Sequence, residues 1–156
     1  MIGAGKKILL VDDEQVFTDN MASLLTARGY RVHSAYNGES ALKALEKERF
    51  DVVVLDLKMP GMDGITTLRE LKKLGLFTET LILTGHGSMD SAVEAIKLGA
   101  YDYLTKPCGI EELVTKIEGA RDKKNGAERK DMEEKIRKVV ESPSSVFDLF
   151  PDKKKT

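Results

Sequence analysis

The chain has 156 residues and a formal net charge of −1, and 41% of its residues are hydrophobic and 33% charged. This composition is typical of a folded globular domain, and the near-neutral charge disfavours a protein whose whole surface binds nucleic acid. The single cysteine, Cys108, excludes a disulfide bond within the chain. The sequence has no apolar run near the roughly 20 residues that span a bilayer, and its first residues lack a signal-peptide core, so we expect a cytoplasmic chain.

Short apolar runs alternate along the chain with segments of helical periodicity. In chain order they predict a strand near 7–11, a helix near 16–28, a strand near 30–34, a helix near 41–45, a strand near 52–55, a helix near 65–71, a strand near 81–83, a helix near 92–96, a strand near 101–104 and a helix near 113–117. Strands that alternate with helices favour right-handed crossovers and a largely parallel sheet covered on both faces. The sequence therefore predicts a doubly wound α/β fold with five strands and five helices.

The composition changes after the last of these helices. Asn125-Gly126 predicts a break, and residues 127–140 predict a separate charged helix with one apolar stripe. We expect a main domain over residues 6–121 and a C-terminal extension, helix and tail, over residues 122–156. This extension is either a solvated helix with a frayed end or a docking element for a partner or a second copy of the chain.

Polar residues follow four of the five predicted strands. They are Asp12 and Asp13 after the first strand, Asp56 after the third, Thr84 after the fourth, and Lys106, followed by Pro107, after the fifth. Ligands of open parallel sheets bind beyond the carboxyl ends of the strands, so we expect these side chains to lie together. Three carboxylates at one rim repel one another, and a hard divalent cation such as Mg²⁺ would compensate their charge. With an ammonium and a hydroxyl nearby, the set predicts phosphoryl transfer in which Asp56 is the nucleophile and forms an aspartyl phosphate.

Each of these residues also has an ordinary structural explanation. The acidic pair could cap the following helix, and Asp56 could begin a turn. Thr84 could simply end its strand, and Lys106 could be a solvated lysine in a loop. Their joint placement at one predicted rim favours a functional site.

Four motifs resemble those of the receiver domains of two-component response regulators. They are Ile8-Leu9-Leu10-Val11-Asp12-Asp13-Glu14, Val52-Val53-Val54-Leu55-Asp56-Leu57-Lys58-Met59-Pro60-Gly61-Met62-Asp63-Gly64, Leu83-Thr84-Gly85 and Gly99-Ala100-Tyr101-Asp102-Tyr103-Leu104-Thr105-Lys106-Pro107. The resemblance extends over residues 6–121 and implies a flavodoxin-like sheet with strand order 2-1-3-4-5. The stretches Thr84-Gly85-His86-Gly87-Ser88 and Ala100-Tyr101-Asp102-Tyr103-Leu104 resemble receivers of sigma-54-dependent transcription activators, although we expect this chain to be stand-alone.

The resemblance implies a role for each acidic residue. Asp56 would accept the phosphoryl group of a histidine kinase phosphohistidine. Asp13, Asp56 and the backbone carbonyl of Lys58 would bind Mg²⁺, and Asp12 would assist through water. We also hypothesise that the Lys58 side chain pairs with Glu14 and hinders the water that attacks the phosphorylated site.

The resemblance also implies a conformational switch. Lys106 would contact the phosphoryl group, Thr84 would move its hydroxyl onto it, and Tyr103 would turn inward behind Thr84. These movements would remodel the face formed by the helix near 92–96, the strand near 101–104 and the helix near 113–117. The peptide bond between Lys106 and Pro107 would be cis.

We therefore expect a response regulator that signals through protein contacts, not an enzyme, with weak self-phosphorylation and self-dephosphorylation. Its partners would be a sensor histidine kinase or phosphotransfer protein and a downstream protein target or a second copy, without direct contact to nucleic acid or membrane. Two alternatives remain open. The chain could be the receiver fragment of a transcription regulator, or a receiver-fold scaffold that works without phosphorylation.

Overall fold

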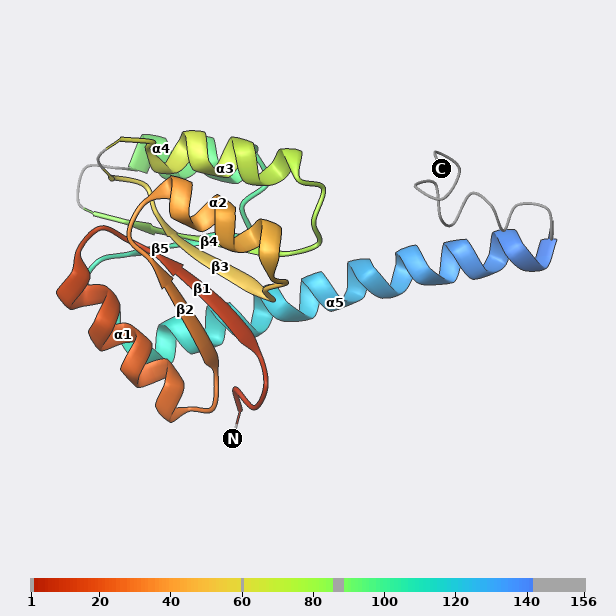
Figure 1. Cartoon of the computed structure of the whole chain (residues 1–156), viewed down its shortest axis with the longest axis horizontal. Helices are drawn as coiled ribbons and strands as arrows, with labels where there is room; N and C mark the ends of the chain where they lie inside the picture. Colours follow the sequence, from red (N-terminus) through yellow and green to blue (C-terminus); the bar gives the residue numbers. More distant parts are fainter. Residues whose placement is uncertain (1, 60, 86–88, 142–156) are drawn as a thin grey trace. The chain divides into compact units, whose positions relative to one another are not determined.

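The structure, a computed structural model, describes residues 2–59, 61–85 and 89–141 (Figure 1). Its strands and helices alternate as the apolar pattern predicts. In chain order they are β1 (Lys7–Val11), α1 (Gln15–Ala27), β2 (Arg31–Ala35), α2 (Gly38–Lys47), β3 (Val52–Asp56), α3 (Gly64–Lys73), β4 (Glu79–Thr84), α4 (Met89–Lys97), β5 (Asp102–Thr105) and α5 (Ile110–Glu141). The chain forms two units, residues 1–124 and residues 125–156, and α5 contributes residues to both.

The five strands form one parallel sheet in the order β2-β1-β3-β4-β5, which confirms the predicted α/β fold and strand order. The strands β1, β3 and β4 are buried over almost their whole length, which is why they read as continuous apolar runs. The edge strand β2 alternates between exposed and half-buried residues. Val11 at the end of β1 pairs with Leu55 in β3. Asp12 directly follows Val11 and Asp56 directly follows Leu55, so both aspartates lie at the same edge of the sheet.

Helices cover both faces of this sheet (Figure 1). The helices α2, α3 and α4 pack on one face, over a core that includes Leu9, Val53 and Ile82. On the other face α1 and the first part of α5 pack over a core that includes Ile8 and Leu81. Neighbouring residues of one strand enter different cores because side chains alternate across a sheet. Among the described residues, no helix has the length and apolar character that crossing a membrane requires.

The carboxylate of Glu118 connects α5 to the start of β1 and to the loop before β2. Lys6 Nζ lies 2.6 Å from Glu118 Oε1, and the hydroxyl of Tyr30 donates to Glu118 Oε2 at 2.5 Å. Burial and the Glu118 carboxylate raise the pKa of Tyr30, which keeps the phenol protonated. Burial would raise the pKa of Glu118, but its hydrogen bonds from Lys6 and Tyr30 outweigh burial and lower it. The carboxylate form of Glu118 is thus part of the folded structure.

Replacing Glu118 with alanine is expected to lower the free energy of unfolding by about 1–3 kcal/mol, because the buried Tyr30 hydroxyl loses its acceptor. Glu111 provides a matched control on the same helix, since it pairs with Arg28 at an exposed position. Glu111→Ala should cost less than about 1 kcal/mol. Urea denaturation at pH 7 measures both values, and equal losses in the two variants would contradict the assigned role of Glu118.

The helix α5 continues through Asn125-Gly126, so the predicted break there is wrong. A glycine in a helix interior costs only about 1 kcal/mol relative to alanine. The residues that follow are mostly strong helix formers, and ion pairs one helical turn apart support them, including Asp131 with Lys135 and Arg137 with Glu141. Within the second unit, residues 125–141 are accordingly helical.

Candidate functional site

The three predicted carboxylates meet at the carboxyl edge of the sheet. One carboxylate oxygen from each of Asp12, Asp13 and Asp56 lies within 4.8 Å of the other two. Asp12 and Asp56 are 2% and 4% exposed, whereas Asp13 is exposed to solvent. The parallel pairing of β1 with β3 produces this arrangement because both strands end at the same edge. The structure thus brings together carboxylates that are 44 positions apart in the sequence.

Asp12 also organises the start of α1. Its Oδ1 accepts a hydrogen bond from the backbone N–H of Glu14 at 2.9 Å, and its backbone carbonyl accepts one from the Thr18 hydroxyl at 3.2 Å. The capping interpretation of the acidic pair is wrong, because the N-cap of α1 is Glu14, without a side-chain capping hydrogen bond, and Asp12 Oδ1 accepts from the N–H of Glu14 itself. Within the described residues, the second oxygen, Oδ2, is buried and accepts no hydrogen bond, although an ammonium lies close to it as an ion pair.

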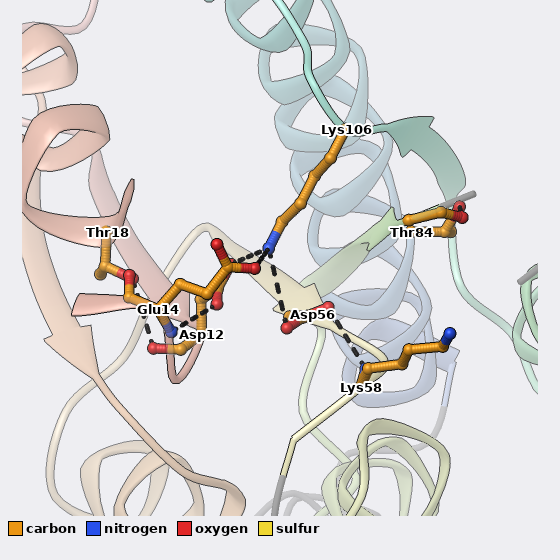
Figure 2. A network of polar contacts seen from close by, with 8 residues as sticks. Asp12, Glu14, Thr18, Asp56, Lys58, Thr84 and Lys106 are labelled. Carbon is orange, nitrogen blue, oxygen red and sulfur yellow. Dashed lines mark hydrogen bonds and ion pairs between the residues drawn. The ribbon is translucent and has the colours of Figure 1, made fainter. Parts of the chain in front are cut away.

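That ammonium belongs to Lys106, in the loop after β5. Figure 2 shows its side chain reaching toward the acidic cluster, where Nζ lies 2.6 Å from Asp12 Oδ2, 3.1 Å from Glu14 Oε1 and 3.7 Å from Asp56 Oδ2. The backbone N–H of Lys106 donates to the carbonyl of Thr84 at 2.7 Å, which fixes the start of the loop. The peptide bond to Pro107 is cis, the isomer that the resemblance implies.

Burial dominates the electrostatics of Asp56. It raises the pKa of Asp56, the neighbouring charge of Asp12 raises it further, and the charge of Lys106 and the backbone N–H of Lys58 oppose these effects, so that the pKa is about 6. For Lys106, burial lowers the pKa, but the close contacts with the carboxylates of Asp12 and Glu14 and the charge of Asp56 outweigh burial and raise it. The site therefore holds one permanent cation among several carboxylates and keeps an excess of negative charge.

Thr84 and Tyr103 lie on the same face of the sheet beside this cluster. Thr84 ends β4 and is buried, and its hydroxyl donates to the carbonyl of Gly85 at 3.3 Å. Figure 2 shows Thr84 on the side of Asp56 away from Glu14. Tyr103 is half-buried, pairs with Ile82 across the strands and packs against the core under α4. Because Ile82 and Thr84 are two residues apart, Tyr103 and Thr84 share one face of the sheet.

The hypothesis that Lys58 pairs with Glu14 is wrong for this structure. The backbone N–H of Lys58 donates to Asp56 Oδ1 at 3.2 Å, but its side chain points away from Glu14 (Figure 2). In the described part of the chain, Lys58 forms no ion pair, and Glu14 pairs with Lys106. The reason is geometric: Glu14 lies at the start of α1 beside Asp12, and Asp56 stands between Glu14 and Lys58.

Sequence reasoning missed one neighbour of the site. The ring of Phe17 lies under Lys106, with Nζ 4.5 Å from the ring centroid. In the sequence Phe17 appears as one of the apolar residues of α1, and it does pack partly against the core beneath that helix. Neither its spacing nor its type distinguishes a core contact from a contact with an ammonium that comes from the far end of the domain.

Comparison with known proteins identifies the family. The family model of the response regulator receiver domain matches residues 8–118, which include the acidic cluster and Lys106. The chain belongs to this family. The receiver is 43% identical over 113 residues to the transcriptional regulatory protein ZraR of Klebsiella oxytoca, an alignment that covers 72% of this chain and 26% of ZraR. It is 36% identical over 127 residues to the transcriptional regulatory protein TrcR of Mycobacterium tuberculosis, covering 81% of this chain and 49% of TrcR.

Solved structures give the same result for the receiver. A response regulator receiver domain protein from Clostridium thermocellum is 38% identical, with a TM-score of 0.74, and the match covers 77% of this chain and 97% of that one. NtrX from Brucella abortus is 32% identical, with a TM-score of 0.76, and the match covers 80% of this chain and 29% of NtrX. The chain thus spans about a quarter of the length of ZraR.

Proposed function

We propose that this chain is a receiver of a two-component phosphorelay, in which Asp56 accepts a phosphoryl group from a histidine kinase or phosphotransfer protein. The proposal assigns residues 6–121 to the receiver and residues 122–156 to an extension. The observation that carries it is the convergence of Asp12, Asp13 and Asp56 beside the ammonium of Lys106. Family membership supports the same role.

In the proposed transfer, an Asp56 carboxylate oxygen forms a bond to phosphorus while the P–N bond of the phosphohistidine breaks. The bonding electron pair stays on the imidazole nitrogen, which regains its lone pair. Lys106, 3.7 Å from Asp56, is placed to neutralise charge on the phosphoryl oxygens, and Thr84 supplies a hydroxyl donor after a movement toward them. Slow self-phosphorylation by small donors and slow hydrolysis follow from the same chemistry.

The residues at this edge fit Mg²⁺. Mg²⁺ prefers oxygen ligands and binds through one or two carboxylates together with waters and phosphate oxygens. Asp12, Asp13 and Asp56 offer three converging carboxylates, and within the described residues the buried Asp12 Oδ2 has the Lys106 ammonium as an ion-pair neighbour at 2.6 Å but accepts no hydrogen bond. We propose that these three side chains, with the Lys58 backbone carbonyl, hold the ion. When bound, Mg²⁺ would supply the positive charge that lets an anionic donor approach a carboxylate.

The output is proposed to pass through Thr84 and Tyr103 to the face formed by α4, β5 and α5. Both residues lie on the sheet face that α4 covers, so a shift of the Thr84 hydroxyl changes the space that the Tyr103 ring can occupy. Large apolar side chains on α4, Met89, Val93 and Ile96, are exposed, which supports a protein target or a second copy as the partner.

A second candidate concerns the context of the receiver. The curated relatives include transcriptional regulatory proteins of which this chain matches a quarter to a half. We propose as the alternative that the receiver controls a transcriptional output, in which case the contact with DNA would be made by another part of the regulator.

Incubation with acetyl phosphate and Mg²⁺ tests the proposed function. Intact mass spectrometry is expected to show one added phosphoryl group on the wild-type chain, dependent on Mg²⁺ and absent from Asp56→Asn. Asp63→Asn is the matched control, because the Asp63 side chain caps α3 by accepting from the Thr66 N–H and asparagine caps equally well. A wild-type chain that is never phosphorylated, or an Asp56→Asn chain that still is, would refute the proposal.

A further inference from the structure

The Lys106 ammonium has more neighbours than the acidic cluster alone. Its side chain is 15% exposed, and Nζ lies 4.5 Å from the centroid of the Phe17 ring, on the α1 side of the site. Glu14 also contacts it, but the Glu14 side chain is 64% exposed, so that contact is weak. Asp12 Oδ2 is the nearest carboxylate, at 2.6 Å, and Asp56 Oδ2 is 1.1 Å more distant, at 3.7 Å.

An aromatic ring attracts an ammonium through the negative potential of its face, and more strongly where water is partly excluded. A ring differs from a carboxylate because it attracts the ammonium without bringing a charge of its own. A lysine side chain is long and has considerable rotamer freedom, so a surface that confines it decides where its charge is located. Phe17 is half-buried and packs against the core beneath α1, and this packing restricts the ring that Lys106 contacts.

We propose that Phe17 is a positioning residue, whose ring holds the Lys106 ammonium within reach of Asp56 but outside hydrogen-bond distance of it. The inference rests on the proposed function, because it takes Asp56 to be the phosphoryl acceptor. With the ammonium held by Phe17 and Asp12, the Asp56 Oδ2 lone pairs remain available for attack on phosphorus. The same ammonium is already close to where the phosphoryl oxygens arrive, so little reorganisation is needed during transfer.

The contact itself can be measured without metal and without phosphorylation. An aromatic ring shifts the NMR resonances of nuclei above its face, so the ε-methylene protons of Lys106 are expected upfield of those of the other lysines. The shift should be lost in Phe17→Leu and retained in Phe17→Tyr, which keeps the ring. Phe77→Leu, at an exposed phenylalanine before β4, should leave the Lys106 resonances unchanged.

The rate of phosphorylation by acetyl phosphate at saturating Mg²⁺ tests the consequence. Phe17→Leu is expected to slow it about two- to fivefold, the range that a partly buried cation–π contact supports, while Phe17→Tyr keeps most of the rate. If Phe17 only stabilised the fold, Phe17→Leu and Phe17→Tyr chains of equal thermal stability would be phosphorylated at equal rates. Equal rates for Phe17→Leu and wild type, or equal losses in the leucine and tyrosine variants, would overturn the positioning role.

The two readouts separate this inference from the proposed function. A wild-type chain that is phosphorylated on Asp56 but shows no upfield shift for Lys106 would overturn the positioning role alone. A wild-type chain that shows the shift but is never phosphorylated would overturn the proposed function and the positioning role together.

Discussion

Asp56→Asn is expected to stabilise the metal-free chain at pH 7, by about 1–3 kcal/mol in the free energy of unfolding. Asp56 is 4% exposed and lies beside Asp12, and burial, followed by the charge of Asp12, raises its pKa to about 6. In the unfolded chain the same carboxyl has a pKa of about 3.9. At pH 7 the folded protein must therefore keep a buried carboxylate ionised, and asparagine removes this cost.

Proton binding at Asp56 determines how the stability of the wild type changes with pH. Between about pH 4 and pH 6 the folded state binds more protons at Asp56 than the unfolded state does, so the stability of the wild type falls as pH rises through this window. Below about pH 4 both states are protonated and the advantage of Asp56→Asn should disappear. Urea denaturation in a chelator at pH 4 and pH 7 measures the difference.

Asp63→Asn is again the informative control, because hydrogen bonds from Thr66 lower the pKa of Asp63 and its carboxylate is favoured in the fold. This variant should show no gain at pH 7. Added Mg²⁺ should narrow the gap between Asp56→Asn and wild type, because the ion is proposed to bind the folded wild-type cluster. An Asp56→Asn chain no more stable than wild type at pH 7 would contradict the assigned electrostatics.

Gly64→Ala is expected to destabilise the receiver by more than about 3 kcal/mol, or to displace the loop after Asp56. A Cβ at Gly64 would lie 2.4 Å from Leu57 Cα and 2.6 Å from the Asp56 carbonyl oxygen. Both are backbone atoms, so no side-chain rotation relieves the clash. The α3 helix begins at Gly64, whose N–H donates to the Leu57 carbonyl, so it packs directly against the segment that carries Asp56, the proposed phosphoryl acceptor.

Gly126→Ala serves as the comparison for this variant. Gly126 sits inside α5, and among the described residues a Cβ there would meet no atom within 4 Å apart from its chain neighbours and the backbone of its own helix. Alanine there should increase helicity and stabilise the helix by about 0.5–1 kcal/mol. Circular dichroism with thermal denaturation distinguishes the two, and a Gly64→Ala chain with wild-type stability and wild-type phosphorylation would refute the close approach described here.

The local patterns of this sequence determined its elements and the residues at the carboxyl edge of the sheet. Short, β-branched apolar runs such as residues 52–55 favour a buried strand, and β3 is one. Because parallel strands end at one edge, Asp12 and Asp56 could be placed together before any coordinate was known. The prediction failed at Asn125-Gly126, because turn-forming residues there are overridden by the helix formers and ion pairs around them.

Only the tertiary structure decided which charged and aromatic groups touch. The expected pairing of Glu14 with Lys58 failed, because the side of Asp56 on which α1 begins brings Glu14 to Lys106. Phe17 and Lys106 are 89 positions apart, and their contact depends on how β5 lies relative to β1 and how α1 rotates on the sheet. Periodicity indicates which side of a segment packs against the core. A contact between two long side chains depends instead on distances of a few ångströms between segments, and no local pattern encodes these distances.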